Sequence, residues 1–398
     1  MARLARYFPG RPASTLLRFI SGIQEPSDAS QQPVFAASIT PTGEHVVVVR
    51  ADRIQLLNVS SGDCERSIQM DRRFDSGIIG WSHAGDFVAF RAEVDDDTIY
   101  VCNTNTGRCI TLSTGHQDVV VATLFSQDKQ EIVSASKDGT IRRSRWNNHV
   151  DGRPQTSPEV LFRCDGAMTA MAVSPDKTWI VSASADYSPP DTSSPDLPAK
   201  PSNEPYGRNG IYPVLRLHKS SGGVVWIEHH ERPIVSLAFS DDGTRVLAGT
   251  LLGKIFLYDL TELIDTRSDQ SAPPATHPSA ILENAFDSGS NLPLPQISFS
   301  PDGRAIITPR SCTPLDVAPA RPLPKPVGNA SSFTTYFIDG DGWLWRVHSH
   351  SAPRRICWVP SALRPMDVCG CSTWSAQGNT IACNAAGYKL VLLDMSRC

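Results

Sequence analysis

One short pattern recurs along the chain: an apolar strand, a polar turn and a second apolar strand. A clear copy is AFSDDGTRVLAGT at residues 238–250. The seven copies begin at Ser38, Gly80, Leu124, Ala172, Ala238, Ser298 and Thr373. Internal repetition decides the architecture of a chain, because each unit needs its neighbours to bury its apolar face. The sequence therefore predicts a repeat protein.

Each copy continues into a third apolar strand and then a further turn. Examples are IQLLNVSSG at residues 54–62 and VLRLHKSSG at residues 214–222. Ser, Thr and Gly tolerate the backbone conformations of a turn, so a fourth strand is expected to follow. Four short strands with regularly spaced turns form one antiparallel sheet. No segment shows sustained helical periodicity, and the fold class is therefore all-β.

The spacing and two complete copies carry a resemblance to a known family. The turns at Thr40, Ser82, Ser126 and Ser174 follow one another at 42, 44 and 48 residues, close to the period of about 40–45 residues of WD40 repeats. The segments 115–146 and 229–260 resemble WD40 repeats throughout. The resemblance extends over nearly the whole chain and implies a β-propeller.

In that family a His, a Ser or Thr, an Asp and a Trp form a buried hydrogen-bonded tetrad in each repeat. The third repeat has His116 and Asp138, with Ser144 at the Trp position. The fifth has His230, Thr250 and Tyr258, with Leu252 in place of the Asp. Other occupants of the Trp position are Leu57, Cys102, His218, Val347 and Leu393. We therefore expect most tetrads to be absent and the blades to depend on apolar packing.

The two ends of the chain are expected to meet. The last repeat stops after its third strand, and residues 14–22 have the pattern of a fourth strand without a blade of its own. In the WD40 family an N-terminal strand completes the last blade and covers a sheet edge that would otherwise invite aggregation. We predict one domain, residues 1–398, with seven blades closed by this strand. An eight-bladed or open ring would need a repeat that the sequence does not show.

Three segments are too long and too polar for the turns of a blade: residues 187–210, 261–293 and 309–332. Their Pro, Ser and Gly content predicts loops or disorder. All three are expected on one rim of the propeller. They are either insertions without a function, tolerated on an exposed surface, or a lid or adaptor surface. The stretch PARPLPKP at residues 319–326 is also compatible with a polyproline II ligand.

Composition excludes several classes of function. The net charge of −4 gives no field that attracts polyanions, so neither nucleic acid nor an anionic membrane is an expected partner. No apolar run approaches the roughly 20 residues that span a bilayer, and the N-terminal residues lack the apolar core of a signal peptide. Their Arg-rich start resembles a transit peptide, but Pro9 and Pro12 would interrupt its helix.

The ten cysteines contain no C-x₂-C pair. Cys369 and Cys371 share a strand face near Cys383, but the spacing fits no common zinc site. We expect reduced, buried thiols, which indicate the cytoplasm or the nucleus.

No sequence motif of catalysis is present, and no cofactor or metal is expected. The acidic run Asp95–Asp97 is expected to be a solvated turn, and His348 and His350 share a face only if their strand extends that far. Two hypotheses remain. The first is a non-catalytic protein-interaction scaffold, and the second is an enzyme with a polar site at the central channel, for which His, Asp or Arg should converge on the axis.

The scaffold hypothesis places its partner on the rim with the long loops. The candidate partner-binding residues, all in loops on that rim, are His116, Asp118, Lys137, Asp138, Glu231 and Arg232. His116, Asp138, His230, Thr250 and Tyr258 are also the tetrad-like structural residues. Protein or peptide partners, within a multiprotein complex, are expected.

The last repeat also carries a weaker resemblance. RRICWVPSALRP at residues 354–365 and the strands after it resemble the terminal repeats of fungal WD40 proteins, some of which join a propeller to a NACHT domain. The resemblance implies a sensor or adaptor. No phosphate-binding loop is present, so a nucleotide switch would lie on another polypeptide.

Overall fold

Short antiparallel sheets follow one another along the chain in the computed structural model. The structure describes residues 18–19, 34–40, 43–50, 52–61, 63–70, 78–82, 86–91, 98–126, 131–145, 157–164, 166–186, 212–220, 223–250, 253–265, 278, 280–282, 297–300, 303–308, 312–315, 334–338, 342–348, 353–358, 374–377, 380–385 and 389–394. These residues form eight sheets.

The first four sheets have four strands each, in chain order. Sheet 1 contains β2 (Val34–Ile39), β3 (His45–Arg50), β4 (Arg53–Asn58) and β5 (Cys64–Gln69). Sheet 2 contains β6 (Ile78–Trp81), β7 (Phe87–Arg91), β8 (Thr98–Asn103) and β9 (Cys109–Ser113). Sheet 3 contains β10 (Val120–Phe125), β11 (Glu131–Ser136), β12 (Thr140–Arg145) and β13 (Glu159–Arg163). Sheet 4 contains β14 (Ala167–Val173), β15 (Trp179–Asp186), β16 (Tyr212–Lys219) and β17 (Val224–His229).

The second half of the chain is less regular. Sheet 5 contains β18 (Ile234–Phe239), β19 (Arg245–Thr250), β20 (Ile255–Asp259) and β21 (Ala280–Leu282), with the short helix α1 (Thr261–Asp265) after β20. Sheet 6 contains β22 (Ser298–Phe299), β23 (Ala305–Ile307) and β24 (Cys312–Pro314). Sheet 7 contains β25 (Thr334–Ile338), β26 (Trp343–His348) and β27 (Arg354–Trp358). Sheet 8 contains β28 (Trp374–Gln377), β29 (Thr380–Ala385), β30 (Lys389–Asp394) and β1 (Arg18–Phe19).

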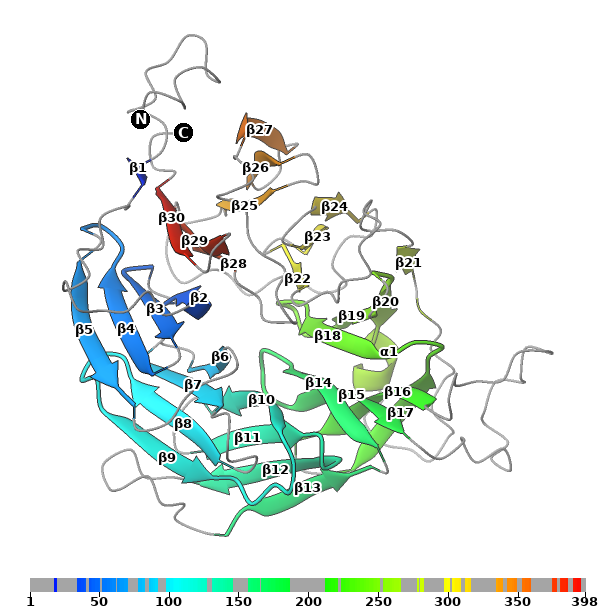
Figure 1. Cartoon of the computed structure of the whole chain (residues 1–398). Helices are drawn as coiled ribbons and strands as arrows, with labels where there is room; N and C mark the ends of the chain where they lie inside the picture. The colour runs from blue at the N-terminus through cyan, green and yellow to red at the C-terminus, as the bar shows by residue number, and fades with distance from the viewer. Residues whose placement is uncertain are drawn as a thin grey trace, which may run out of the picture.

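The sheets are arranged around an arc with the first strand of each sheet innermost (Figure 1). Neighbouring sheets meet through these inner strands, as β10 meets β6 and β14 meets β18. β2 also lies against β28 and β29, so the first and last sheets are neighbours. This arrangement leaves the fourth strand of each four-stranded sheet at the outer edge.

A side-chain hydroxyl closes the first hairpin turn in six sheets. The hydroxyl oxygen accepts a hydrogen bond from the backbone N–H five residues later, at 2.8–3.2 Å. The six residues are Thr40, Ser82, Ser126, Ser174, Ser240 and Ser300. The Ser or Thr that recurs in the sequence pattern is therefore the residue that fixes the turn.

The same turn places one backbone position in the left-handed region. Gly43, Gly243 and Gly303 occupy it with φ of 77°, 70° and 65°. In sheet 4 the position is taken by Lys177 with φ of 61°. Glycine adopts this conformation at little cost, whereas a residue with a Cβ is strained there.

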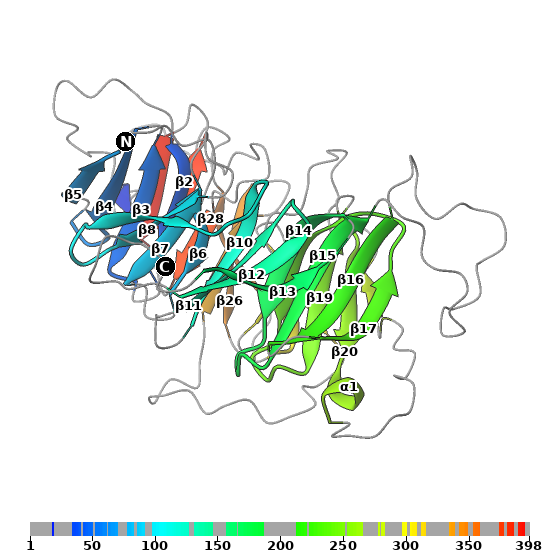
Figure 2. The ribbon, with the colours of Figure 1, turned by 90° about the horizontal axis from the view of Figure 1, so that it is seen from below.

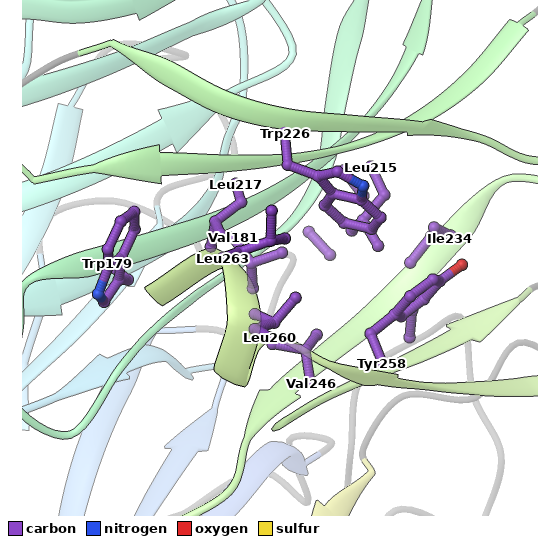
Figure 3. Packing of buried hydrophobic residues seen from close by; sticks show 13 residues of the cluster. Trp179, Val181, Leu215, Leu217, Trp226, Ile234, Val246, Tyr258, Leu260 and Leu263 are labelled. Atoms are coloured by element: carbon purple, nitrogen blue, oxygen red, sulfur yellow. The ribbon is translucent and has the colours of Figure 1, made fainter. Parts of the chain in front are cut away.

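The apolar core is divided into layers between neighbouring sheets. One layer joins sheets 4 and 5, where Trp226, Leu215 and Leu217 face Val246 and Tyr258 (Figure 3). Similar layers join sheets 1 and 2, sheets 2 and 3, sheets 3 and 4, and sheets 5 and 6. A strand buried on both faces needs a continuous apolar run, which explains the sequence HVVVVR in β3.

The number of sheets differs from the prediction of seven blades. The sixth predicted repeat is divided between sheets 6 and 7, because β25 and β26 pair with each other in the register Phe337↔Trp345. Only residues 339–342 separate them in the sequence, whereas pairing with β23 would have to close a much longer loop. The described strands do not show a closed ring of seven blades.

Two of the three long inserts contain regular structure. Residues 261–293 include α1 and β21, and β21 is the fourth strand of sheet 5. Residues 309–332 include β24, which pairs with β23. Residues 187–210 lie outside the described residues. Short polar-flanked strands such as Ala280–Leu282 give too weak a pattern to be separated from a loop in the sequence.

The N-terminal segment pairs with the C-terminal sheet. β1 is antiparallel to β30, with Arg18 opposite Asp394 and Phe19 opposite Leu393 (Figure 1). β1 lies within residues 14–22, and it takes the outer-edge position that the last sheet lacks.

The turn geometry predicts opposite effects for two substitutions. Lys177→Gly should stabilise the protein by about 1 kcal/mol, because glycine relieves the left-handed strain, and this gain outweighs the loss of the Lys177 Nζ bond to the carbonyl of Phe125. Gly243→Ala should destabilise it by about 1 kcal/mol, because an added Cβ has room, 3.6 Å from Pro175, but an unfavourable φ. Urea unfolding of both variants measures the two changes, and a destabilised Lys177→Gly variant would contradict this account.

Candidate functional site

Two loops meet at one end of sheet 3, before β10 and between β11 and β12. The N–H of Lys137 donates to the carbonyl of Val119, and the hydroxyl of Ser136 donates to the carbonyl of Asp118 at 2.7 Å. Gly139 has a φ of 77°, and a Cβ there would lie 2.6 Å from the carbonyl oxygen of Cys164. Only glycine fits this turn, which holds Asp138 against the first loop.

His116 is the centre of a buried polar cluster at this point. Its Nε2 lies 2.9 Å from the hydroxyl of Ser134, and its Nδ1 lies 3.1 Å from a carboxylate oxygen of Asp138 and 2.9 Å from the hydroxyl of Thr140. The carboxylate of Asp138 also accepts from the N–H of Gln117 at 2.9 Å. The cluster thus connects the two loops with β11 and β12.

Burial and hydrogen bonds keep the imidazole of His116 neutral beside the carboxylate of Asp138. Burial lowers the pKa of His116 below its usual value, although the charge of Asp138 opposes this. Burial alone would raise the pKa of Asp138, but hydrogen bonds from Thr140 and the N–H of Gln117 lower it to about 2. Asp138 is therefore ionised at neutral pH and fully used by partners within the protein.

Ser134, His116 and Asp138 are in the order of a hydrolytic triad, but no substrate reaches them. Ser134 is 0% exposed and His116 is 1% exposed. A nucleophile must contact the reacting carbonyl, which this burial prevents. The arrangement is therefore structural.

Sheet 5 retains a different pair of tetrad-like residues, His230 and Tyr258. The hydroxyl of Tyr258 lies 3.0 Å from Nε2 of His230. Thr250 does not join them, because its hydroxyl oxygen accepts from the N–H of Lys254. By register, the residue that corresponds to Ser134 is Ala248, so the tyrosine hydroxyl takes the partner role directly.

Sheet 4 holds a third variant that sequence reasoning did not identify. The hydroxyl of Ser182 lies 2.7 Å from Nε2 of His218, which is 3% exposed. His218 occupies the Trp position, and in the sequence it was counted only as a lost Trp. His218 lies opposite Ile180, as Ser144 lies opposite Ile132 in sheet 3. Its position in the repeat, close to that of Ser182 on the neighbouring strand, was the signal for a polar pair.

Comparison with known proteins gives these sheets a family. The family model of the WD domain, G-beta repeat, matches residues 107–142, 158–188 and 223–259. Each match begins at or just before the fourth strand of one sheet and runs into the strands of the next. The chain contains WD40 repeats, and the sheets that these matches span correspond to blades of that family. The buried clusters around His116 and His230 lie where the resemblance places the tetrad.

Individual relatives are distant. Periodic tryptophan protein 2 of Arabidopsis thaliana is 24% identical over 208 residues, which are 49% of this chain and 23% of that protein. The chain therefore matches less than a quarter of the length of this relative. The crystal structure of the C-terminal WD40 domain of Sif2 aligns with a TM-score of 0.47 at 17% identity, over 69% of this chain and 66% of that one.

The candidate partner-binding residues lie at one end of the blades, here called the upper rim. It consists of residues 115–119, 137–139 and 230–233; the first hairpin turns, such as 240–244, form the opposite, lower rim. Lys137 and Glu231 are exposed, and Arg232 is half-buried. Asp118 caps its own turn by accepting from the N–H of Val119 at 2.6 Å. Among the described residues no ion pair joins Lys137, Glu231 and Arg232 to one another.

The long inserts do not all share this rim. The N–H of Leu260 donates to the carbonyl of Thr244, so α1 starts at the lower rim, where Figure 2 shows it projecting from the blades. The N–H of Leu315 donates to the carbonyl of Arg304, which places the end of β24 on the same rim. The expectation of three inserts on one rim is therefore corrected, because residues 261–293 follow the third strand β20 and residues 309–332 themselves supply the third strand β24.

The cysteine prediction is corrected in blade 2. Cys102 and Cys109 are opposite each other on β8 and β9 and form a disulfide. Among the described residues, Cys64, Cys164 and Cys312 form no disulfide. Asp95–Asp97, Cys369, Cys371 and His350 lie outside the described residues.

Within the described residues no group of three His, Cys, Asp or Glu side chains is placed to hold a metal ion. No described helix is long and apolar enough to cross a membrane.

The tetrad remnant in blade 3 gives a matched pair of substitutions. Ser134→Ala should destabilise the protein by about 1–3 kcal/mol, because Nε2 of His116 is left buried without a partner. Ser144→Ala should be neutral or stabilising, because the buried Ser144 hydroxyl has no hydrogen-bond partner among the described residues. Chemical denaturation compares the two, and equal losses would contradict the assigned role of Ser134.

Stability should have a pH optimum set by groups in blades 4 and 5. Burial lowers the pKa of both His218 and His230 from 6.5 to about 4. The contribution of these two histidines to the free energy of unfolding is present above pH 6.5. It is lost as the pH falls toward 4, because the unfolded state binds protons more readily than the folded state. Burial raises the pKa of Glu228 from 4.5 to about 7, so its contribution is present below pH 4.5 and is lost as the pH rises through 7.

Glu228→Gln separates the two sides of this optimum. The variant should keep the loss of stability on the acid side, and because it lacks the contribution of Glu228, its free energy of unfolding relative to the wild type should rise as the pH rises from 4.5 to about 7. Urea unfolding across this pH range is the measurement. An unchanged profile on the alkaline side would show that Glu228 does not cause the decline.

Proposed function

We propose that the chain is a non-catalytic interaction scaffold or adaptor that binds a protein or peptide partner on its upper rim. The observation that carries this proposal is where the polar side chains lie, since some are buried and others are exposed. His116, Ser134 and Asp138, which are suited to chemistry, are sealed within blade 3, whereas Lys137 and Glu231 extend from the loops. A rigid framework with charged loops suits recognition of another protein.

The alternative is an enzyme with a polar site at the central channel, and the inner strands do not favour it. β10, β14 and β18 contain no His, Asp, Glu, Lys or Arg. Catalysis at the axis needs several such side chains to converge. The scaffold is therefore the better-supported function.

Several finer statements belong to the same proposal. Pairing of β1 with β30 supports closure by the N-terminal strand, and a ring of seven blades stays a prediction. A multiprotein complex in the cytoplasm or nucleus, without nucleic acid or membrane as partner, agrees with the net charge of −4. The resemblance to fungal NACHT–WD40 propellers would make the chain a sensor whose nucleotide switch lies on another polypeptide.

Charge reversal on the upper rim tests the proposal. Lys137→Glu combined with Arg232→Glu should remove or weaken by about tenfold the partners recovered by pull-down, because rim charges steer and orient association. Arg304→Glu is the matched control, since it reverses an exposed cation on the lower rim. Both variants should melt like the wild type. Retention of partners by the double variant and their loss from the control would place the partner on the other rim.

A further inference from the structure

The outer flank of blade 3 carries exposed charge and apolar surface on one side of the sheet. Arg142 is opposite Val160, and Thr140 is opposite Arg163, across the β12–β13 pair. Directly opposed residues of antiparallel strands point to the same side, so Arg142, Val160 and Arg163 form one surface. We call these three residues the blade 3 flank.

The other side of these strands is covered by blade 4. Ile141 packs with Met168 and Ile180 in the layer between the two blades. Arg143 donates to the carbonyl of Ser220 at 2.6 Å and pairs with Glu159 at 3.6 Å. The flank is therefore the side turned away from blade 4, and its charges are separate from those of the seam.

The charges of the flank are not balanced within the described residues. Arg143 and Arg145 have carboxylate partners in Glu159 and Glu131. Arg142 donates only from Nε to the hydroxyl of Thr140, and no ion pair involves Arg163. Two cations that form no ion pair therefore share one surface, and the nearest carboxylate to Arg142 in this hydrogen-bonded chain, that of Asp138, is reached only through the hydroxyl of Thr140.

Local geometry holds Arg142 in place. A Cβ on Gly115 would lie 3.0 Å from Nη1 of Arg142 and 3.5 Å from Pro158. Glycine at this position, with a φ of 69°, leaves the space that the guanidinium occupies. A side chain that is already positioned loses less entropy on binding.

β13, which carries Val160 and Arg163 of the flank, is also an open edge. No described strand pairs with the outer side of β13. Val160 is 41% exposed, beside Arg142. An unpaired edge with an exposed apolar side chain is a surface on which an extended segment of another protein can add as a further strand.

We propose that the blade 3 flank binds an extended acidic segment of a partner protein, which adds to the edge of β13. Carboxylates of the segment pair with Arg142 and Arg163, and an apolar side chain covers Val160. The inference rests on the proposed scaffold function for the nature of the occupant, but it assigns a second surface, distinct from the upper-rim residues Lys137 and Arg232.

Other occupants and other edges fit less well. Nucleic acid would use exposed aromatic side chains for stacking, but the ring of Phe162 lies against His218 of blade 4. The edge of β17 exposes Val224 and Ile227, but the neighbouring Arg216 donates to Ser184 and lies over the ring of Phe162. In the described part of the chain the flank combines an open edge, an exposed apolar side chain and two cations that form no ion pair.

Fluorescence anisotropy with a synthetic peptide tests the proposal. The labelled probe has two valines flanked on each side by Glu and Asp, and the control probe has Gln and Asn at the acidic positions. The full chain should bind the acidic probe, at least about tenfold more tightly than the neutral one, and affinity should fall as salt is added. Absence of binding to the acidic probe, or equal binding of both, would overturn the proposal.

Substitutions locate the site. Arg163→Glu should weaken the acidic probe by about tenfold and Val160→Ser by about threefold, because one removes charge complementarity and the other removes apolar contact. Lys219→Glu is the matched control, since it reverses an exposed cation on blade 4, and it should change nothing. All three positions lie at the surface, and melting temperatures check that each variant is folded.

Two further arms separate the competing readings. A single-stranded oligonucleotide that binds more tightly than the peptide and is lost in Arg163→Glu would replace the proposed occupant with nucleic acid. Loss of the peptide in Lys137→Glu with Arg232→Glu, but not in Arg163→Glu, would move the site to the upper rim. If instead the pull-down partners ignore the upper-rim variant while the peptide still depends on Arg163, the flank stands and the upper-rim proposal fails.

Discussion

Six blades of this chain depend on one small interaction, the hydroxyl that closes the first hairpin turn. The bond from the N–H of Arg245 to the hydroxyl of Ser240 is typical, and Asp242 in turn accepts from the N–H of Thr244 at 3.0 Å. The turn aligns the first two strands, and this register decides which side chains face each neighbouring blade. The recurring polar turn in the sequence is therefore a device for register, and the apolar layers follow from it.

The tetrad shows how the blades keep a buried polar contact after the usual residues are lost. Blade 3 retains His and Ser, blade 5 joins His230 to Tyr258, and blade 4 joins Ser182 to a His at the Trp position. In each case a buried nitrogen finds a hydroxyl, because an unpaired polar group in the core costs about 1–3 kcal/mol. Tetrad-like residues were expected in blades 3 and 5, whereas in blade 4, where apolar packing was expected, the structure shows the polar pair Ser182–His218.

The sequence was sufficient for features that depend on local pattern. The all-β class, the first five repeats and the polar turns follow from alternation and turn chemistry within about 45 residues. The division of the sixth repeat into two sheets, and the assignment of Ala280–Leu282 to blade 5, depend on which of several short strands pair across long segments. The pair Ser182–His218 was hidden for a similar reason, because its members are separated by the insert 187–210 in the sequence and meet only through strand register.

The same register argument connects the fold to binding. The WD repeat matches run from the outer strand of one blade into the next, so each outer strand is tied covalently to the inner strands that follow it. β13 is consequently held along one side by pairing with β12, and its C-terminal end continues into β14 of blade 4. An edge fixed in this way holds the backbone of Val160 and Arg163 in one conformation, beside Arg142 on β12. The main entropic cost of adding a partner strand is then the ordering of that strand. Rigidity that arises from the repeat is thus what makes an outer flank, as well as a loop rim, usable for recognition.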